Sequence, residues 1–220
     1  MYKILMSLPL FNGIGHDEIS KIAESTKLHF LKYRQGESIV TLGEPCSHIK
    51  FIISGCVQST ITSQDGGFSI SQILDAPNVI MPDFMFGRST QYPCTVTALQ
   101  PTGILQISKA DYMTILSSDK IFMFNFLNIL SGNSQKAIIG AFANTIEQQI
   151  ALKVVALTQS QGRDIIVKCA DLAAFLNTTQ QQLNSTLESL KQRKIIDYNP
   201  TEITVLSRTD LINLLITNQV

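Results

Sequence analysis

The stretch DLAAFLNTTQQQLNSTLESLKQRKII, residues 171–196, carries four polar side chains that one face of a short helix would present to a partner. They are Gln180, Gln181, Asn184 and Ser185. A primary amide offers a hydrogen-bond donor and an acceptor together, which matches the edge of adenine in the major groove of DNA, whereas arginine pairs best with guanine. Residues of these types would suit contact with adenine better than contact with guanine.

Two short helices and the turn between them must position these side chains. Asn177 takes the turn position where a left-handed backbone is often needed, and asparagine tolerates that conformation better than most residues. Thr179 and Gln182 have the T-x-x-Q spacing of a capping box, which predicts the start of the second helix. The buried faces are predicted to comprise Leu172, Phe175 and Leu176 in the first helix and Leu183, Leu187 and Leu190 in the second.

The segments on either side complete a small domain. An amphipathic helix is expected at Ile150–Leu157, a stop at Gln161–Gly162 and a short strand at Ile165–Val167. After the second helix, the segments Ile195–Asn199 and Glu202–Leu206 flank a proline turn. We interpret them as a hairpin placed like the wing of a winged helix.

Cations beside the second helix would supply affinity for phosphates, together with the backbone amides at its N-terminus. The predicted DNA contacts are Lys168, Thr178, Thr179, Gln180, Gln181, Asn184, Ser185, Lys191, Arg193 and Lys194. From Glu147 onward, however, seven basic residues are balanced by seven acidic ones. Such a segment supplies little positive field, so a helix that has lost DNA and binds protein is the alternative.

Composition limits the architecture and the partners. With 220 residues the chain fits one large domain or two unequal ones. Its formal net charge is zero, so no global charge attracts nucleic acid or an anionic membrane. Only 15% of the residues are charged while 45% are hydrophobic, which indicates that a partner covers some apolar surface. A homodimer is the simplest such arrangement.

A long helix from Asp119 to Phe142 is predicted to form the contact between two copies. The segment lacks proline, is apolar on more than one side and would extend about 36 Å. Its small residues would let two backbones approach each other. The expected dimer contacts are Phe124, Leu127, Ile138 and Ala141. Two alternatives remain: a helix buried within one monomer, or a break at Gly132, because glycine inside a helix costs about 1 kcal/mol.

Cysteine and histidine positions predict no metal ion and no cofactor. The four cysteines form no C-x-x-C pair, and the three histidines form no H-x-H pair. We interpret the cysteines as thiols in a reducing cytoplasm. The opening residues 1–11 lack a cleavage site, and the apolar segment 121–130 is too short to span a bilayer. These features predict a cytoplasmic protein without a membrane partner.

Short strands with glycine turns are predicted between residues 28 and 107. They are expected at Ser38–Leu42, Ile49–Ile53, Val57–Thr62, Ser69–Leu74, Cys94–Leu99 and Ile104–Ile107. This pattern indicates an antiparallel sandwich, barrel or jelly roll. A helical segment at Leu8–Lys27 should pack on its outside. Ser108 and Asp111, in an incomplete capping box, predict the start of another helix.

The order of these parts is similar to that of a known family. The chain resembles the bacterial Crp/Fnr superfamily of cyclic-AMP receptor proteins and fumarate-nitrate regulators in LPLFNGIGHDEISKIA, in YRQGESIVTLGEPCSHIKFIISGCV, in the long helix and in residues 171–196 with their wing. The resemblance implies an α+β fold with an N-terminal cyclic-nucleotide-binding-like β-roll (jelly roll), a dimerisation helix and a C-terminal winged helix-turn-helix. The implied boundaries are 1–118 for the sensor domain, 119–146 for the linker and dimerisation helix, and 147–220 for the DNA-binding domain.

The same resemblance implies a homodimeric transcription regulator that binds a pseudo-palindromic site on double-stranded DNA, with RNA polymerase as a further partner. In the family the reading helix commonly carries Arg-Glu and Ser-Arg pairs. This chain has Gln180–Gln181 and Asn184–Ser185 instead, which predicts a changed base preference. The oxygen sensors of the family need a cysteine cluster near the N-terminus, whereas this chain has no cysteine before Cys46.

The residues that hold the cyclic nucleotide in relatives are replaced here. In one register the family's Arg-Ser pair falls on Tyr92–Pro93 and its Gly-Glu pair on Met81–Pro82. None of these side chains can neutralise a cyclic phosphate, and proline lacks an N–H donor. A second register would use Arg88–Ser89, with Pro77–Asn78 in place of Gly-Glu. We therefore expect no response to cyclic AMP, and either an unidentified small effector or a vestigial pocket.

Two other function classes fit part of the sequence. One is a β-roll protein whose degenerate DNA-binding domain acts through protein–protein contacts. The other is a metal-dependent cupin-like enzyme, which shares the jelly roll but needs two or three histidines and a carboxylate that converge. Because the histidines are scattered and no Ser-His-Asp, P-loop or G-x-G-x-x-G pattern appears, we expect no enzyme.

Overall fold

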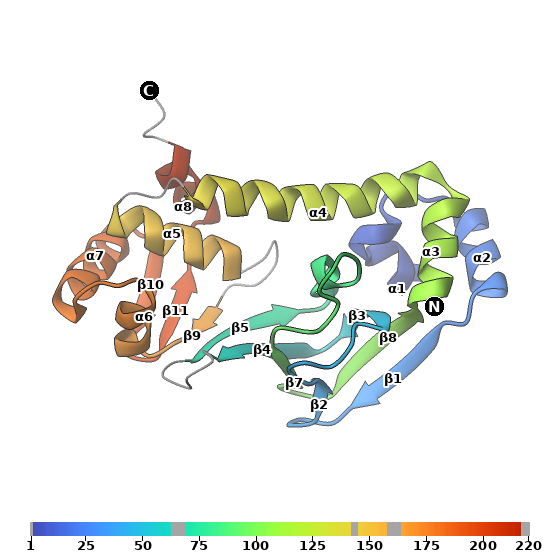
Figure 1. The fold of residues 1–220 in the computed structure, drawn as a ribbon, viewed down its shortest axis with the longest axis horizontal. Helices are drawn as coiled ribbons and strands as arrows, with labels where there is room; N and C mark the ends of the chain where they lie inside the picture. The colour runs from blue at the N-terminus through green and yellow to red at the C-terminus, as the bar shows by residue number, and fades with distance from the viewer. Residues whose placement is uncertain (1, 63–68, 142–144, 158–163, 217–220) are drawn as a thin grey trace. The chain divides into compact units, whose positions relative to one another are not determined.

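The computed structural model describes residues 2–62, 69–141, 145–157 and 164–216 (Figure 1). Its contacts divide the chain into two compact units. The N-terminal unit comprises Met1–Val57 and Asp75–Gly132, and the C-terminal unit comprises Gln58–Leu74 and Asn133–Val220. Both units combine helices with antiparallel strands, so the predicted α+β class is confirmed.

Three short helical segments open the N-terminal unit. They are α1 (Tyr2–Ser7), the 3-10 helix η1 (Pro9–Phe11) and α2 (His16–Ser25). The single helix predicted at Leu8–Lys27 is therefore wrong in its extent. A proline starts η1 and residues 12–15 form a turn and a loop, which ends one helical piece before the next begins.

The strands of the N-terminal unit are antiparallel. A four-stranded sheet has the order β1 (His29–Tyr33), β8 (Thr102–Ser108), β3 (His48–Ser54) and β6 (Asn78–Ile80), and β2 (Ser38–Val40) pairs with β7 (Thr95–Ala98). A second 3-10 helix, η2 (Pro82–Phe84), follows β6. Gly55 follows β3 with φ of 82°, and a Cβ atom there would lie 2.7 Å from the carbonyl oxygen of Pro101. Only glycine fits this turn.

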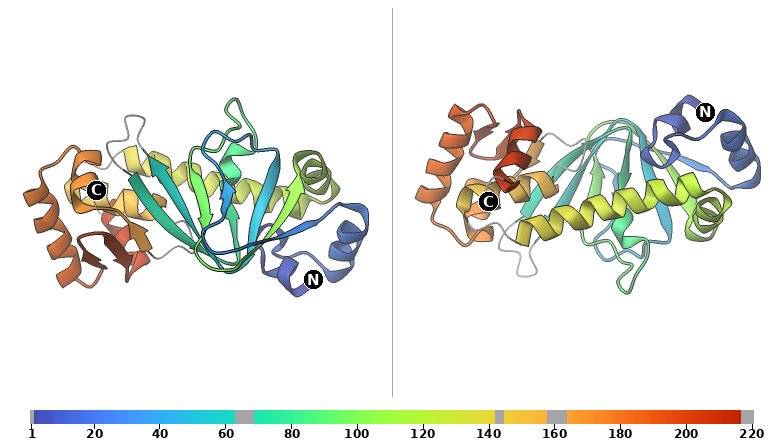
Figure 2. Two further views of the ribbon diagram at one scale, coloured as in Figure 1. Left: turned by 90° about the horizontal axis from the view of Figure 1, so that it is seen from below. Right: turned by 90° about the horizontal axis from the view of Figure 1, so that it is seen from above.

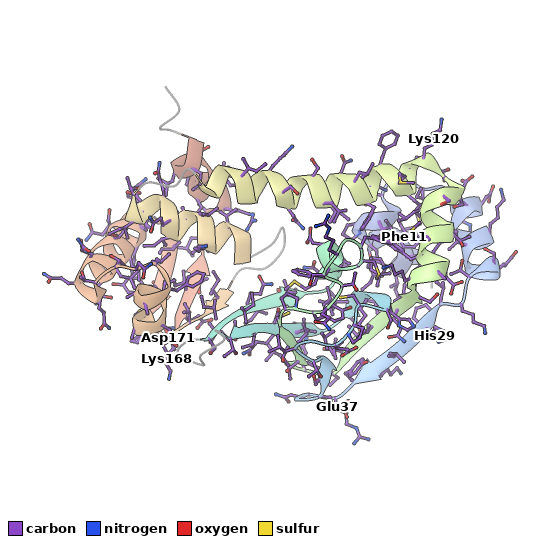
Figure 3. The ribbon with its side chains drawn as sticks, in the orientation of Figure 1. Phe11, His29, Glu37, Lys120, Lys168 and Asp171 are labelled. Atoms are coloured by element: carbon purple, nitrogen blue, oxygen red, sulfur yellow. The ribbon has the colours of Figure 1, made fainter. Side chains whose placement is uncertain are left out.

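Aromatic side chains join the helices of the N-terminal unit to its sheet. The ring of Phe11, labelled in Figure 3, lies 6.5 Å from that of Phe51 in β3 and 5.4 Å from that of Phe122. The ring of Tyr112 lies 5.5 Å from that of Phe126. Edge-on aromatic contacts at these distances add to the apolar area that the same side chains bury.

Helix α3 (Lys109–Ser118) begins where the sequence predicted. The hydroxyl oxygen of Ser108 accepts a hydrogen bond from the Asp111 N–H at 3.1 Å, and the hydroxyl donates to Asp111 Oδ2 at 2.7 Å. The Asp111 carboxylate thus accepts from the Ser108 hydroxyl, whereas the N3 side chain of a full capping box accepts from the backbone N–H of the N-cap residue.

Helix α4 (Lys120–Ala141) is one continuous helix, as Figure 1 shows. It runs through Gly132, so the break considered there does not occur. A Cβ atom at Gly132 would meet no other atom within 4 Å. Near its start, the amide of Asn125 donates to the carbonyl oxygens of Leu10 at 2.9 Å and Asn12 at 2.8 Å, which ties this helix to η1. Phe142, the predicted helix end, lies outside the described residues.

The C-terminal unit contains α5 (Ile146–Leu157), β9 (Asp164–Ile166), α6 (Cys169–Phe175), α7 (Gln180–Gln192), β10 (Ile196–Asn199), β11 (Glu202–Val205) and α8 (Arg208–Ile216). The predicted helix pair and wing strands are confirmed, whereas α8 was not predicted and the stop at Gln161–Gly162 lies outside the described residues. The strand order is β10, β11, β9, β5 (Ser69–Asp75) and β4 (Cys56–Thr62). Ser71 pairs with Ile166 and Gln72 with Ile165.

One apolar cluster holds the C-terminal unit together. It contains buried residues of α5, β9, α6, α7, both wing strands and α8, and it includes Ile70 of β5. Among the described helices of the whole chain, none combines the length and hydropathy needed to cross a membrane.

A buried ammonium group connects β3 to β2 and to the loop that follows β2. Lys50 in β3 is only 6% exposed. Its Nζ donates to the carbonyl oxygen of Ile39 and to Glu44 Oε1, both at 3.1 Å, and lies 5.3 Å from the centre of the Tyr92 ring. A buried cation is tolerated only with such partners, because desolvation disfavours the charged form.

We predict that Glu44→Ala destabilises the protein more than Lys50→Met. Removal of the carboxylate leaves the buried ammonium without its charged acceptor, at a cost of about 1–3 kcal/mol, less than for a fully buried pair because Glu44 is partly exposed. Lys50→Met removes the buried charge and keeps most of the volume, so its cost should be smaller. Urea unfolding of both variants measures the difference. A loss for Lys50→Met equal to or above that for Glu44→Ala would contradict the prediction.

Candidate nucleic-acid interface

The turn between α6 and α7 has the backbone that the sequence predicted. Asn177 adopts a left-handed conformation with φ of 50°. The N–H of Thr178 donates to the carbonyl oxygen of Ala173 at 3.0 Å, and the N–H of Leu176 donates to that of Leu172 at 3.0 Å. These bonds satisfy the end of α6 and fix the direction in which α7 starts.

Two threonines and a glutamine hold the N-terminus of α7. The hydroxyl oxygen of Thr179 accepts from the Gln182 N–H at 3.2 Å, which confirms the predicted cap. The hydroxyls of Thr178 and Thr179 donate to Gln182 Oε1 at 3.1 and 3.2 Å. Both hydroxyls, predicted as DNA contacts, therefore also position the helix.

The C-terminus of α7 ends in a Schellman motif. Lys194 has φ of 57°, its N–H donates to the carbonyl oxygen of Lys191 at 2.9 Å, and the N–H of Ile195 donates to that of Leu190 at 3.0 Å. The turn sends the chain directly into β10. It therefore places the β10–β11 hairpin beside α7.

The outward surface of α7 divides into two rows. Figure 2 shows that one long side of this helix is not covered by other elements, while its three leucines at 183, 187 and 190 are fully buried on the other side. Gln181 and Ser185 are exposed in one row. The other row faces a cavity of about 620 Å³. The cavity is lined by Lys168, Cys169, Ala170, Gln180, Asn184, Glu188, Lys191, Tyr198, Asn199, Pro200 and Thr201.

Glu188 is a residue of this face that sequence reasoning missed. It follows Asn184 by four positions and Gln180 by eight, and this spacing was the available signal. The hydroxyl of Tyr198 in β10 donates to Glu188 Oε2 at 3.2 Å. The structure thus brings Gln180 and Asn184 together with an acidic residue and with the wing.

Two of the predicted phosphate-binding cations are ion-paired. Lys191 Nζ lies 2.8 Å from Asp197 Oδ1 in β10, and Arg193 pairs with Glu147 of α5. The hydrogen bond from Lys191 lowers the pKa of Asp197, and the same bond raises the pKa of Lys191. Both groups therefore stay charged at neutral pH.

The other two cations are exposed. Lys168 is the N-cap residue of α6, where Figure 3 labels it beside Asp171, and Lys194 follows α7. Within the part of the chain that the structure describes, neither side chain forms an ion pair. Lys168 lines the same cavity as Gln180 and Asn184. It is thus the cation best placed to meet a phosphate near the start of α7.

Of the residues that the two sequence registers place at the family's nucleotide-binding pairs, Tyr92 and Pro82 are buried. Tyr92 is 2% exposed, its N–H donates to the carbonyl oxygen of Glu44 at 2.9 Å, and its hydroxyl donates to that of His48 at 3.2 Å. Burial raises the pKa of Tyr92, so its hydroxyl stays neutral. Met81–Pro82 forms the start of η2, with Pro82 buried. Arg88–Ser89 is exposed, and Pro93 is half-buried.

Helix α4 presents an apolar row to the outside. The side chains of Phe124, Leu127 and Ile138 are 61%, 48% and 62% exposed. Ser131 and Ser134 lie exposed between them at spacings of three and four residues. These are the spacings of a coiled-coil seam. The side chain of Ala141, the fourth predicted dimer contact, lies outside those described.

Among the described residues, no three His, Cys, Asp or Glu side chains come together as metal ligands would.

Comparison with known proteins identifies the N-terminal domain and the fold. Residues 30–119 match the family model of the cyclic nucleotide-binding domain. A search of the curated proteins finds no significant match.

Three solved structures are similar to this chain. The catabolite activator protein of Thermus thermophilus is 19% identical with a TM-score of 0.55, over 95% of this chain and 99% of that one. The sensor domain of the transcriptional regulator DNR from Pseudomonas aeruginosa is 21% identical with a TM-score of 0.54, over 66% and 93%. A structure described as a Crp/Fnr-family transcriptional regulator from Eubacterium rectale is 17% identical with a TM-score of 0.50, over 96% and 99%.

Residues 30–119 therefore match the model of the cyclic nucleotide-binding domain, and the whole chain is similar in fold to the catabolite activator protein and to a Crp/Fnr-family regulator, in agreement with the resemblance drawn from its sequence.

Proposed function

We propose that this protein is a sequence-specific DNA-binding transcription regulator of the Crp/Fnr type, and that α7 reads the bases. The observation that carries this proposal is the surface of α7. A helix capped at both ends buries its leucines and turns amide and hydroxyl side chains outward, beside a hairpin wing. Residues 1–118 are the proposed sensor domain, 119–146 the dimerisation segment and 147–220 the DNA-binding domain.

In the proposed complex the first two turns of α7 enter the major groove. Gln180 and Gln181 occupy the first helical positions, from which side chains of a recognition helix reach base edges. Asn184 lies one turn further along the row that Gln180 begins. Lys168 lies beside these residues and would contact a phosphate, which adds affinity without sequence information.

Binding selection from a random DNA pool tests this function. We predict that the parent protein enriches a pseudo-palindrome with half-sites about 34 Å apart, one duplex turn. Gln180→Ala or Gln181→Ala should relax the preference at particular positions and cost about 1–3 kcal/mol on the best site, with little effect on random DNA. The matched control is Gln192→Ala, which removes the same side chain from the last residue of α7.

Two results would contradict this proposal. If the selection enriches no motif, the protein does not recognise a DNA sequence. If the motif is enriched but stays the same after both glutamine substitutions, α7 is not the reader and the wing turn at Asn199–Thr201 becomes the candidate.

We further propose that two copies pair along α4. The row of Phe124, Leu127 and Ile138 is too exposed and too regularly spaced to be explained by contacts within one chain. The exposed serines of the row, like Gly132 beside it, leave room for a second backbone. This pairing would also give the two α7 helices the symmetry that a palindromic site requires.

The double variant Leu127→Glu with Ile138→Glu should be a monomer in analytical ultracentrifugation, because like charges would meet across the seam. Met113→Glu is the control. Met113 in α3 is 47% exposed, close to the 48% of Leu127, but lies on another helix, so this variant should remain a dimer. A parent protein that sediments as a monomer at micromolar concentration would refute the proposal.

We propose that the sensor domain does not recognise a cyclic nucleotide. Tyr92 is buried, and its hydroxyl donates to the carbonyl oxygen of His48. Pro82 is buried at the start of η2. Neither residue can replace the guanidinium that a buried cyclic phosphate requires. An unidentified small effector, contact with RNA polymerase, a cytoplasmic location and the absence of enzymatic activity stay predictions.

Isothermal titration calorimetry should detect no binding of cyclic AMP or cyclic GMP at micromolar concentrations, because the pair that would hold the phosphate is absent. Binding in this range would favour the other register. Arg88→Gln should then abolish this binding. Arg34→Gln, which removes an arginine from the turn at Gly36 instead, should leave it unchanged.

A further inference from the structure

One carboxylate, on α7, lines the face proposed to meet DNA, and another, on the wing, pairs with a lysine of that face. Glu188 lies in the row of Gln180 and Asn184, and Asp197 is the second residue of β10. DNA is a dense polyanion, so carboxylates at its interface oppose binding unless a cation or a base donor balances them. The groups around these two carboxylates show which partners offset their negative charge.

Lys191 is the cation nearest to these carboxylates, and contacts with the wing hold its position. Its Nζ lies 2.8 Å from Asp197 Oδ1 and 5.5 Å from the centre of the Tyr198 ring. Asp197 Oδ1 also accepts the N–H of Tyr198 at 2.8 Å, and the Tyr198 hydroxyl donates to Glu188. The carboxylate of Asp197 is thus fixed by its own backbone, and Lys191 bends toward it.

We propose that Asp197 restrains Lys191 and thereby lowers the affinity of each subunit for the DNA backbone. This inference rests on the proposed DNA-binding function. A phosphate that approaches Lys191 has to displace Asp197 or accept its repulsion, so the lysine contributes little to phosphate binding. Asp197 is a positioning residue, since it acts through Lys191 and needs no contact with a base.

The pair is exposed, which keeps the restraint reversible. The side chains of Lys191 and Asp197 are 45% and 56% exposed. Ion pairs in water are weak, so a correctly placed phosphate can compete for the ammonium group. The restraint therefore lowers the affinity for any DNA without preventing binding.

Low affinity per subunit makes binding depend on the dimer. When each half-site contact is weak, a stable complex requires that both reading helices engage at once, since the second contact is then intramolecular. Sites with a single half, or with the wrong spacing, would be released. Asp197 thus favours full palindromic sites over half-sites.

The chain supplies a matched control for the charge change. Glu147 pairs with Arg193, and this pair also joins α7 to a neighbouring element of the same unit. Neither residue lines the cavity beside α7. Glu147→Gln and Asp197→Asn therefore raise the net charge equally and each break one ion pair, but only the second frees a cation that faces the cavity.

The test measures the salt dependence of DNA binding by fluorescence anisotropy, with the selected duplex and a random duplex of equal length. Asp197→Asn keeps the oxygen that accepts the Tyr198 N–H, so the fold should be retained, which thermal unfolding checks. We expect about five- to tenfold tighter binding to both duplexes near 0.1 M salt, and a salt slope steeper by about 1.8, the value for one more phosphate contact in each of the two subunits. Adding Lys191→Gln to Asp197→Asn should remove this gain.

The outcomes separate the inference from the proposed function. If the parent binds its selected site and Asp197→Asn leaves the salt slope unchanged, or changes it no more than Glu147→Gln does, Asp197 is not a restraint and the DNA-binding function stands. If neither the parent nor any variant binds either duplex, the proposed function fails and the inference fails with it.

Discussion

Burial of three leucines along one side of α7 is the constraint on which the C-terminal unit depends. Leu183, Leu187 and Leu190 are fully buried, and each removes a side chain worth about 1.5–3 kcal/mol from water. Their burial fixes the rotation of the helix about its own axis. The polar residues between them are then forced outward, and the cap at Thr179 and the turn at Lys194 decide where this exposed face begins and ends.

Local signals made much of this unit predictable from sequence. The helical spacing of leucines, the T-x-x-Q cap and the asparagine in the turn each depend on residues within a few positions of one another, and the structure agrees with all three. The capped start of α3 at Ser108 is another example. Such features need no knowledge of distant parts of the chain, because backbone geometry determines them.

Features that depend on distant residues were missed. The pair of Arg193 with Glu147 joins elements whose approach only the tertiary fold decides, and the pair of Lys191 with Asp197, six positions apart, depends on the turn at Lys194 that brings β10 beside α7. Sequence reasoning therefore counted both cations as available to phosphates. The packing role of Tyr92 was missed for the same reason, since its partners Glu44 and His48 lie more than forty positions away.

The proposed base-reading face and the proposed dimer row share one physical principle. At Gln180 and Asn184 the chain uses neutral amides, and beside them it pairs Lys191 with an acid, so this part of the face offers little charge and depends on hydrogen-bond geometry. Along α4 the apolar residues lie toward the two ends of the described row, with Ser131 and Ser134 between them. Polar positions within such a seam lower its stability while they specify its register. In both places the arrangement makes the binding free energy less favourable and defines the geometry of the contact more strictly. A regulator with weak half-site contacts depends on exact pairing of its subunits. A register fixed by α4 would therefore be a requirement for the proposed reading of DNA by α7.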